Sequence, residues 1–145
     1  MLDIASLLAD PCRSWAPGPP GDEAAIRALQ LSAPVELPSE YIDLPRHSDG
    51  GEGPLALPPL YFMLYPAEYA AELNASDEHR DRYPGYFVFG SNGGLESIAF
   101  DVRDARPWRI AMYDPVAGVE SAVVIAEDMA SFMPAIGLES PEGGV

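Results

Sequence analysis

The sequence predicts an α+β fold in which an antiparallel β-meander sheet packs with several helices in a single domain. The chain of 145 residues is 48% hydrophobic, which is enough for one core of ordinary size. Helical patterns come first, extended segments follow, and one helical pattern closes the chain, an order typical of α+β folds. Sixteen prolines and thirteen glycines indicate many turns and short elements instead of a helical bundle.

The first third of the chain is predicted to form three short helices. Residues 3–9 make the first, and the Pro/Gly-rich connector 15–21 is not expected to hold regular structure. The second, over 22–31, begins with an aspartate, which is a good N-terminal cap. The third begins in LPSEY (37–41), with proline in its first turn, and Pro45 is expected to end it.

The middle of the chain is predicted to hold short extended segments and one helix. The acidic, glycine-rich residues 48–53 are expected to form a loop. Residues 55–57 and 60–65 are extended candidates, and Pro58-Pro59 between them indicates either a sheet edge or a bend between two short strands. A helix is expected over 67–73.

The β-meander begins at Tyr86. Tyr86 to Phe89 is apolar on both faces, so this strand should be central and covered twice. Three further strands are expected: 95–101, 108–113 and 119–125. Period-two alternation in 108–113 indicates one buried face. Asn92-Gly93 and Gly118 mark the turns between these strands.

A final helix is predicted to open at Glu127 and Asp128, because carboxylates favour the positive end of the helix dipole. Its apolar stripe recurs at i, i+3, i+4 and i+7: Met129, Phe132, Met133 and Ile136. Pro134 is expected to end or kink the helix. The chain thus divides into an N-terminal helix and connector (1–21), the main domain (22–137) and a frayed C-terminal tail (138–145).

The charge distribution argues against nucleic-acid binding. The formal net charge is −15, and all eight Lys or Arg positions are arginine. A phosphate-binding surface needs clustered cations. Here the one basic concentration is offset by neighbouring acids; it comprises Arg80, Arg82, Arg103, Arg106 and Arg109. Strong negative charge steers a protein toward basic partners, although it also keeps a protein in solution.

The sequence predicts a cytoplasmic protein without membrane association. Its single cysteine, Cys12, excludes an internal disulfide and a multi-cysteine zinc site. The N-terminus lacks the basic flank of a signal peptide. No stretch approaches the ~20 apolar residues that a membrane-spanning helix requires.

No catalytic, metal or cofactor site is predicted. His79 lies between Asp77 and Asp81, but no Cys or second His stands at ligand spacing, which favours a solvated polar turn. Ser91 departs from the Gly-x-Ser-x-Gly nucleophile motif, because position 89 is phenylalanine. Paired carboxylates for glycosidase-type chemistry stay open, since no pair among the many acids is distinguished.

The segment FVFGSNGGLESIAFD (87–101), followed by a strand that ends in Tyr-Asp-Pro, resembles the SUKH superfamily. This bacterial immunity-protein family also contains relatives of a yeast cell-wall-synthesis regulator. The stronger similarity spans 84–136. A weaker one spans 22–53, where LPSEY (37–41) and DGGEG (49–53) are similar to the family's Leu-Pro-x-x-Tyr and Asn-Gly-Gly-x-Gly motifs. The resemblance implies a sheet-plus-helices fold.

The resemblance also implies a non-enzymatic protein-binding module without a cofactor. Such a protein would be an immunity protein that neutralises a cognate toxin, often a nuclease, by covering its basic site with an acidic surface. The loop residues expected to contact the basic toxin domain are Asp49, Glu52, Asn92, Glu96, Asp114 and Glu120. Two alternatives stay open: a regulatory or scaffold protein with an unrelated partner, and an enzyme or small-ligand-binding protein with a groove beside the sheet.

Overall fold

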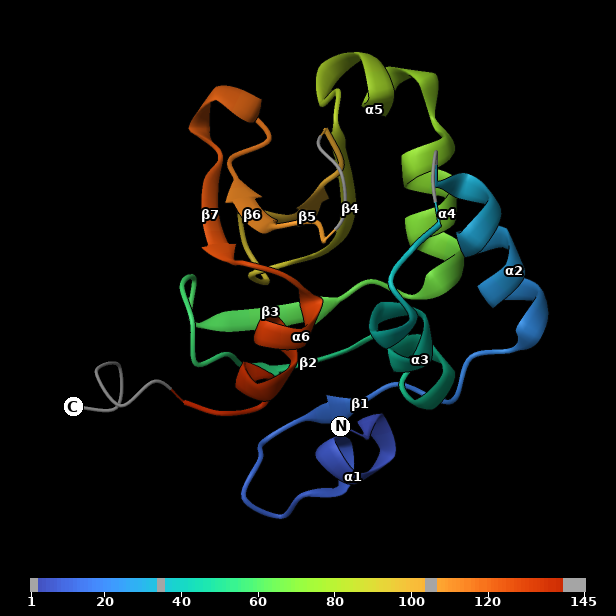
Figure 1. The fold of residues 1–145 in the computed structure, drawn as a ribbon, viewed down its shortest axis with the longest axis vertical. Helices are drawn as coiled ribbons and strands as arrows, with labels where there is room; N and C mark the ends of the chain where they lie inside the picture. Colours follow the sequence, from blue (N-terminus) through green and yellow to red (C-terminus); the bar gives the residue numbers. More distant parts are fainter. Residues whose placement is uncertain (1–2, 34–35, 104–106, 140–145) are drawn as a thin grey trace.

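A computed structural model of the protein describes residues 3–33, 36–103 and 107–139. These residues form a single α+β domain built on a seven-stranded antiparallel sheet, which confirms the predicted fold class. The order of the strands in the sheet follows their order in the chain (Figure 1). This meander arises because short connections join neighbouring antiparallel strands.

The strands are β1 (Ala16–Pro17), β2 (Gly51–Pro54), β3 (Tyr61–Leu64), β4 (Tyr86–Ser91), β5 (Ser97–Asp101), β6 (Ile110–Tyr113) and β7 (Val123–Ala126). The α-helices are α1 (Ile4–Ala9), α2 (Glu23–Ser32), α3 (Ser39–His47), α4 (Ala67–Ala75), α5 (Asp77–Arg82) and α6 (Met129–Phe132). Two 3₁₀ turns are η1 (Val119–Ser121) and η2 (Met133–Ala135). In Figure 1, α2 and α4 lie side by side next to the sheet, and α6 lies over β3. Within the described ranges, no helix is long and apolar enough to cross a membrane.

The central strand β4 is buried along its whole length, as its sequence predicts. Phe87 and Phe89 belong to the main hydrophobic core on one face of the sheet. Tyr86 and Val88 belong to a smaller cluster on the other face. Both faces of the strand are therefore covered, which explains why the run from Tyr86 to Phe89 is apolar on both faces.

The prediction of one buried face for 108–113 is wrong. Ile110 packs in the main core, but Ala111 and Tyr113 on the opposite face are also buried. Tyr83 and Val119, from segments before and after the strand, pack against this second face. The period-two alternation within the strand does not reveal this cover, because the covering residues lie outside the strand.

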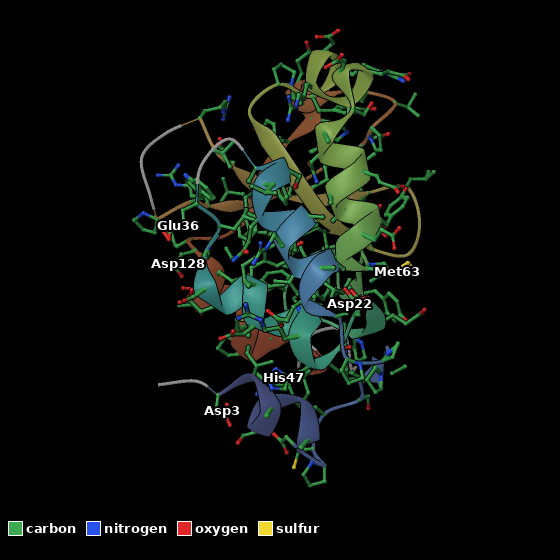
Figure 2. All side chains as sticks on the ribbon, turned by 90° about the vertical axis from the view of Figure 1, so that its right-hand side faces the viewer. Asp3, Asp22, Glu36, His47, Met63 and Asp128 are labelled. Atoms are coloured by element: carbon green, nitrogen blue, oxygen red, sulfur yellow. The ribbon has the colours of Figure 1, made fainter. Side chains whose placement is uncertain are left out.

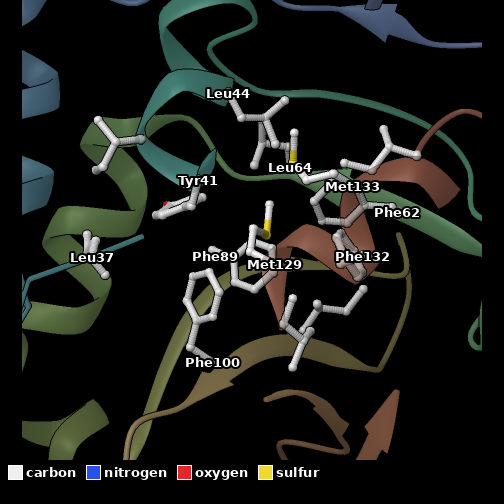
Figure 3. Packing of buried hydrophobic residues seen from close by; sticks show 14 of the residues in the cluster. Leu37, Tyr41, Leu44, Phe62, Leu64, Phe89, Phe100, Met129, Phe132 and Met133 are labelled. Carbon is white, nitrogen blue, oxygen red and sulfur yellow. The ribbon is translucent and has the colours of Figure 1, made fainter. Parts of the chain in front are cut away.

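The main core is rich in aromatic residues (Figure 3). Tyr41 of α3 is fully buried, and its ring lies 5.2 Å from that of Phe89 and 5.4 Å from that of Phe100. The ring of Phe132 in α6 meets Phe62 of β3 edge-on at 5.1 Å. Aromatic pairs in this geometry contribute beyond their buried area. They join α3 and α6 to the same side of the sheet.

The closing helix is confirmed in its main features. All four residues of the predicted apolar stripe are buried, and the Asp128 carboxylate accepts a hydrogen bond from the Ser131 N–H at 2.8 Å. The helix ends at Phe132 and tightens into η2 around Pro134, as a proline in this position requires. Of the predicted tail 138–145, residues 140–145 lie outside the described residues.

The predictions of an irregular connector at 15–21 and a loop at 48–53 are wrong in part, because each contains a short strand. Ala16 pairs with Glu52 in the β1–β2 ladder. Gly53 permits this pairing, since a Cβ there would collide with the carbonyl of Ser14 and approach the Trp15 ring. The N-terminal segment is thereby attached to the edge of the sheet.

Several element boundaries also differ from the sequence predictions. Helix α3 continues past Pro45 to His47, because a proline in the last turn removes one hydrogen bond while Ser48 N still donates to Leu44 O at 2.8 Å. The polar segment after α4 forms helix α5, capped by Ser76. The last strand begins at Val123, after the 3₁₀ turn η1.

Candidate functional site

Five of the six residues predicted to contact a partner lie near one end of the sheet strands. The sheet register aligns one residue from each of β2 to β6 in a single row: Glu52, Met63, Ser91, Ser97 and Tyr113. Asn92, Glu96 and Asp114 are adjacent to members of this row in the chain. Glu120 of η1 is close to Asp114, because Asp114 N donates to the hydroxyl of Ser121, the residue after Glu120, at 2.9 Å. We call the five predicted residues, Glu52, Asn92, Glu96, Asp114 and Glu120, the strand-end surface.

Three of the six side chains stabilise their own loops. Asp49, which lies apart from the other five, accepts a hydrogen bond from Ala67 N at 2.7 Å and so joins its loop to the start of α4. Asn92 Oδ1 accepts from Gly94 N at 2.9 Å and from Glu96 N at 3.1 Å. The Asp114 carboxylate accepts from Val116 N at 2.8 Å. These polar atoms are already engaged by backbone N–H groups, as is common in Asx turns.

The β4–β5 connection contains the turn that Asn92-Gly93 predicts. It is a loop of residues 92–96 in which only Gly93 has a positive φ, +79°. Asn92 N also donates to Glu96 O at 3.1 Å, which closes the loop. The carboxylates that the strand-end surface presents are Glu52 and Glu120, which are exposed, and Glu96, which is half-buried. Glu52 also accepts a hydrogen bond from the Tyr61 hydroxyl.

A second acidic surface surrounds α3, where two adjoining hollows of about 540 and 490 Å³ share Ser39, Glu40 and Ala130. We call them together the α3 groove. Five carboxylates line it: Asp3, Glu36, Glu40, Asp43 and Asp128. Asp3, Glu36, His47 and Asp128 lie along the same side of the molecule in Figure 2. The groove therefore joins acids from three separate parts of the chain.

The structure holds several of these acids in place. Asp3 and Asp128 cap α1 and α6. The Ser6 hydroxyl donates to Asp3 at 2.7 Å, and this bond lowers the pKa of the Asp3 carboxyl from its ordinary value. Asp43 pairs with Arg46 at 3.2 Å, so its charge is partly offset. Carboxylates that are held in fixed positions provide a stable negative field for a cationic partner.

The floor of the α3 groove is apolar. Trp108 and Met129 line the first hollow, and Ile4 and Met133 line the second. Trp108 is only 4% exposed, because its ring packs against Phe100 at 6.1 Å. An apolar centre with a charged rim is the usual composition of a protein-binding surface.

Sequence reasoning missed the α3 groove. Its carboxylates come from position 3, from 36–43 and from position 128, and their convergence depends on how α1, α3 and α6 pack. Two signals were visible, since Asp3 and Asp128 both stand at helix starts where an acid is expected. Neither signal indicates that the two helix starts flank the same groove.

The residues considered for chemistry have structural surroundings. Ser91 Oγ accepts a hydrogen bond from Gly93 N at 3.1 Å within the β4–β5 loop. The predicted solvated turn around His79 is wrong, because this residue lies in α5 and is 7% exposed. Across the ranges that the structure describes, no group of three or more His, Cys, Asp or Glu residues is arranged to hold a metal ion.

Comparison with known proteins identifies a family. No curated protein matches the chain. The model of the SMI1/KNR4 family (SUKH-1) matches residues 20–134. This range includes the strands β2 to β7 and most of the α3 groove; of the groove residues named above, Asp3 and Ile4 lie before it. Since this match covers most of the 145 residues, the chain belongs to the SMI1/KNR4 family (SUKH-1), whose members are generally non-enzymatic immunity or regulatory proteins.

Proposed function

We propose that this protein is an immunity protein that binds a cognate basic toxin and neutralises it by covering the toxin's cationic site. The observation that carries the proposal is the α3 groove, in which five carboxylates surround an apolar floor. Family membership supports a protein-binding role, and the net charge of −15 supports a basic partner. A nuclease is a suitable target, because its nucleic-acid site must be cationic.

The mechanism is stoichiometric occlusion. The field of the acidic surface accelerates encounter with a basic domain, and the apolar floor supplies the desolvated centre of the interface. Arginine side chains of the toxin would fit the rim, because a guanidinium forms paired hydrogen bonds with a carboxylate. The substrate of the toxin is then excluded for as long as the complex lasts.

The α3 groove and the strand-end surface predicted from the sequence are competing locations for this contact. The test is a pull-down from host lysate with the tagged full chain, followed by binding measurements on the identified partner. A basic toxin domain that binds with an association rate falling steeply with salt is the expected result. A neutral partner whose binding is insensitive to salt would instead favour a regulatory or scaffold protein.

Charge reversal then locates the interface. Glu36→Lys with Glu40→Lys changes the α3 groove without removing the capping residues Asp3 and Asp128. It is expected to weaken toxin binding at least about tenfold, equivalent to about 1.4 kcal/mol. Glu96→Lys with Glu120→Lys tests the strand-end surface by the same change in charge.

The matched control is Glu68→Lys with Glu72→Lys, on the exposed side of α4. It separates a local contact from the effect of total charge, because all three double variants change the net charge equally. If the α3 groove variant binds the toxin as tightly as the control variant while the strand-end variant loses affinity, the toxin interface is not the α3 groove. If none of the three differs, occlusion by acidic surface is wrong.

A further inference from the structure

A second cavity, of about 290 Å³, lies away from the α3 groove, where the end of α2, the end of α4 and helix α5 meet the start of β4. We call it the α5 cavity. Figure 1 shows α5 beside β4 at the end of the domain that is remote from α1. Its volume is close to the lower limit for ligand sites, about 300 Å³. It is large enough for about ten water molecules or one small organic molecule.

The walls of the α5 cavity are mostly apolar. Tyr86, Phe87 and Val102 line it from the sheet side, and Pro84 lines it from the preceding turn. Phe87 is 2% exposed and belongs to the main core, so this wall is rigid. An apolar wall of this kind suits the flat or aliphatic body of a small molecule.

One side chain in the wall has a buried ring nitrogen without a hydrogen-bond partner among the described residues. His79 lines the α5 cavity and is 7% exposed, and among the described residues its Nε2 atom makes no hydrogen bond. Buried polar atoms are nearly always paired, so an unpaired ring nitrogen beside a cavity indicates a ligand or water that completes the pair.

A cation lies beside this histidine. Arg80 lines the same cavity, and its Nε donates to the carbonyl of Asn74 at 3.0 Å. This bond orients the guanidinium. Its two terminal nitrogens form no hydrogen bond with the residues that the structure describes, so they can pair with a planar anion. Such paired bonding is the reason that arginine is common in carboxylate sites.

Two further arginines lie beside the α5 cavity, and each is paired with an acid. The stem of Arg103 packs against Gly85 in the cavity wall, while its guanidinium pairs with Asp101 at 2.8 Å and lies over the Tyr86 ring at 5.1 Å. Arg82 lies over the ring of Tyr83 at 5.6 Å, and it is 3.9 Å from Glu78. The charges of these two arginines are therefore offset, and Arg80 is the cation from which we derive the preference for an anion.

From this juxtaposition we infer that the α5 cavity is a binding site for a small carboxylic acid with an apolar body. The carboxylate pairs with Arg80 and reaches His79, while the body of the ligand packs on Phe87 and Val102. This function is separate from the proposed toxin interface, which involves neither α5 nor the start of β4.

The test is a titration of the full-length, ¹⁵N-labelled protein with benzoate, followed by two-dimensional NMR. Saturable shifts of backbone amides are expected at residues 79–87 and at Val102. Benzamide, the neutral isostere, should bind at least about tenfold more weakly, because it cannot form the charged pair. Acetate, which lacks the apolar body, should bind more weakly still.

Two variants and one control complete the experiment. Arg80→Gln should weaken benzoate binding about tenfold, the loss expected for one charge-assisted hydrogen bond, while Arg82→Gln should change it less than about twofold. Val102→Phe fills the cavity and should abolish binding while the far-UV circular dichroism spectrum is kept. Any of three results would overturn the inference. The first is the absence of saturable shifts with benzoate, and the second is equal affinity for benzoate and benzamide. The third is that Arg80→Gln and Val102→Phe both bind benzoate as the wild type does. Toxin binding is expected to be the same in these variants, so failure here is distinguishable from failure of the proposed immunity function.

Discussion

Single polar side chains act as cross-links in this small domain. Ser48 is fully buried and joins the connector 15–18 to the loop 48–50. Its hydroxyl donates to Gly50 O at 2.6 Å and accepts from Trp15 Nε1 and Gly18 N, each at 3.1 Å. All of its hydrogen-bonding capacity is used. His79 is the contrasting case, because it is buried and its Nε2 has no partner within the described part of the chain.

The burial of His79 gives the first prediction, a loss of stability in mild acid. Burial lowers the pKa of the His79 imidazole from its ordinary 6.5, and a hydrogen bond with the Tyr86 backbone offsets only part of this. Above pH 6.5 the ring is neutral in both the folded and the unfolded chain. As the pH falls below 6.5, the unfolded chain binds a proton first, so the free energy of unfolding decreases until the folded ring is also protonated.

The measurement is urea denaturation between pH 7.5 and pH 5 for the wild type and His79→Gln. The wild type should lose more stability than His79→Gln over this interval, because only the wild type carries the titrating buried ring. His47→Gln is the control at an exposed histidine and should follow the wild type. Parallel pH profiles for the wild type and His79→Gln would contradict the prediction.

At the scale of elements, one side chain of α4 takes the place of a missing strand. β3 pairs with β4 only at Ser91 and Gly90, so Val88 lies beyond its end. Asn74 Nδ2 donates to Val88 O at 2.8 Å, and Val88 N donates to Asn74 Oδ1 at 2.9 Å. The amide thus reproduces the two bonds of a strand neighbour, and it locks α4 onto the sheet.

Asn74→Ala is therefore expected to lower the free energy of unfolding by about 3 kcal/mol. The substitution leaves the N–H and C=O of Val88 without partners in a buried site, and each unpaired group costs roughly 1–3 kcal/mol. Chemical denaturation monitored by circular dichroism measures the change. Glu72→Ala on the exposed side of the same helix is the control and should stay within about 0.5 kcal/mol of the wild type. A similar effect of the two substitutions would show that the amide does not replace a strand.

At the scale of the whole molecule, the dominant feature is charge. The net charge of −15 is far from neutral for 145 residues, and most of the ion pairs in the described residues are on the surface. Exposed pairs contribute little stability, so they do not offset the mutual repulsion of the carboxylates. The same repulsion is the source of the field that we propose attracts a basic toxin.

Screening should therefore stabilise the fold. Raising NaCl from about 20 mM to about 500 mM shortens the Debye length from roughly 20 Å to a few ångströms and weakens the repulsion. We expect an increase in Tm by differential scanning calorimetry at pH 7. The double variant Glu68→Gln with Glu72→Gln, which removes two exposed charges, should have a higher Tm at low salt and a smaller response to NaCl. A Tm that falls with NaCl would mean that attractive pairs outweigh the repulsion.

Local pattern was sufficient for much of the fold. The Asp22 cap, the apolar run from Tyr86 to Phe89 and the stripe from Met129 to Ile136 are determined by neighbours in the chain, and the structure confirms all three. The family resemblance carried by residues 87–101 is local as well, and the family match confirms it. Net charge, which suggests the class of partner, is a property of composition alone.

Only the tertiary structure decided which residues meet. The strand β1 exists because Gly53 lets Ser14 approach. The second face of β6 is buried because Tyr83 and Val119 cover it. The α3 groove forms because α1 and α6 pack beside α3. The α5 cavity likewise combines Arg80 with residues of β4. Hydrophobic period and capping chemistry act over a few residues, whereas a site is formed by side chains that are distant in sequence. The sequence therefore determined most of the elements, the family and the charge, whereas the packing of the elements determined the strands β1 and β2 at one edge of the sheet and the surfaces on which function depends.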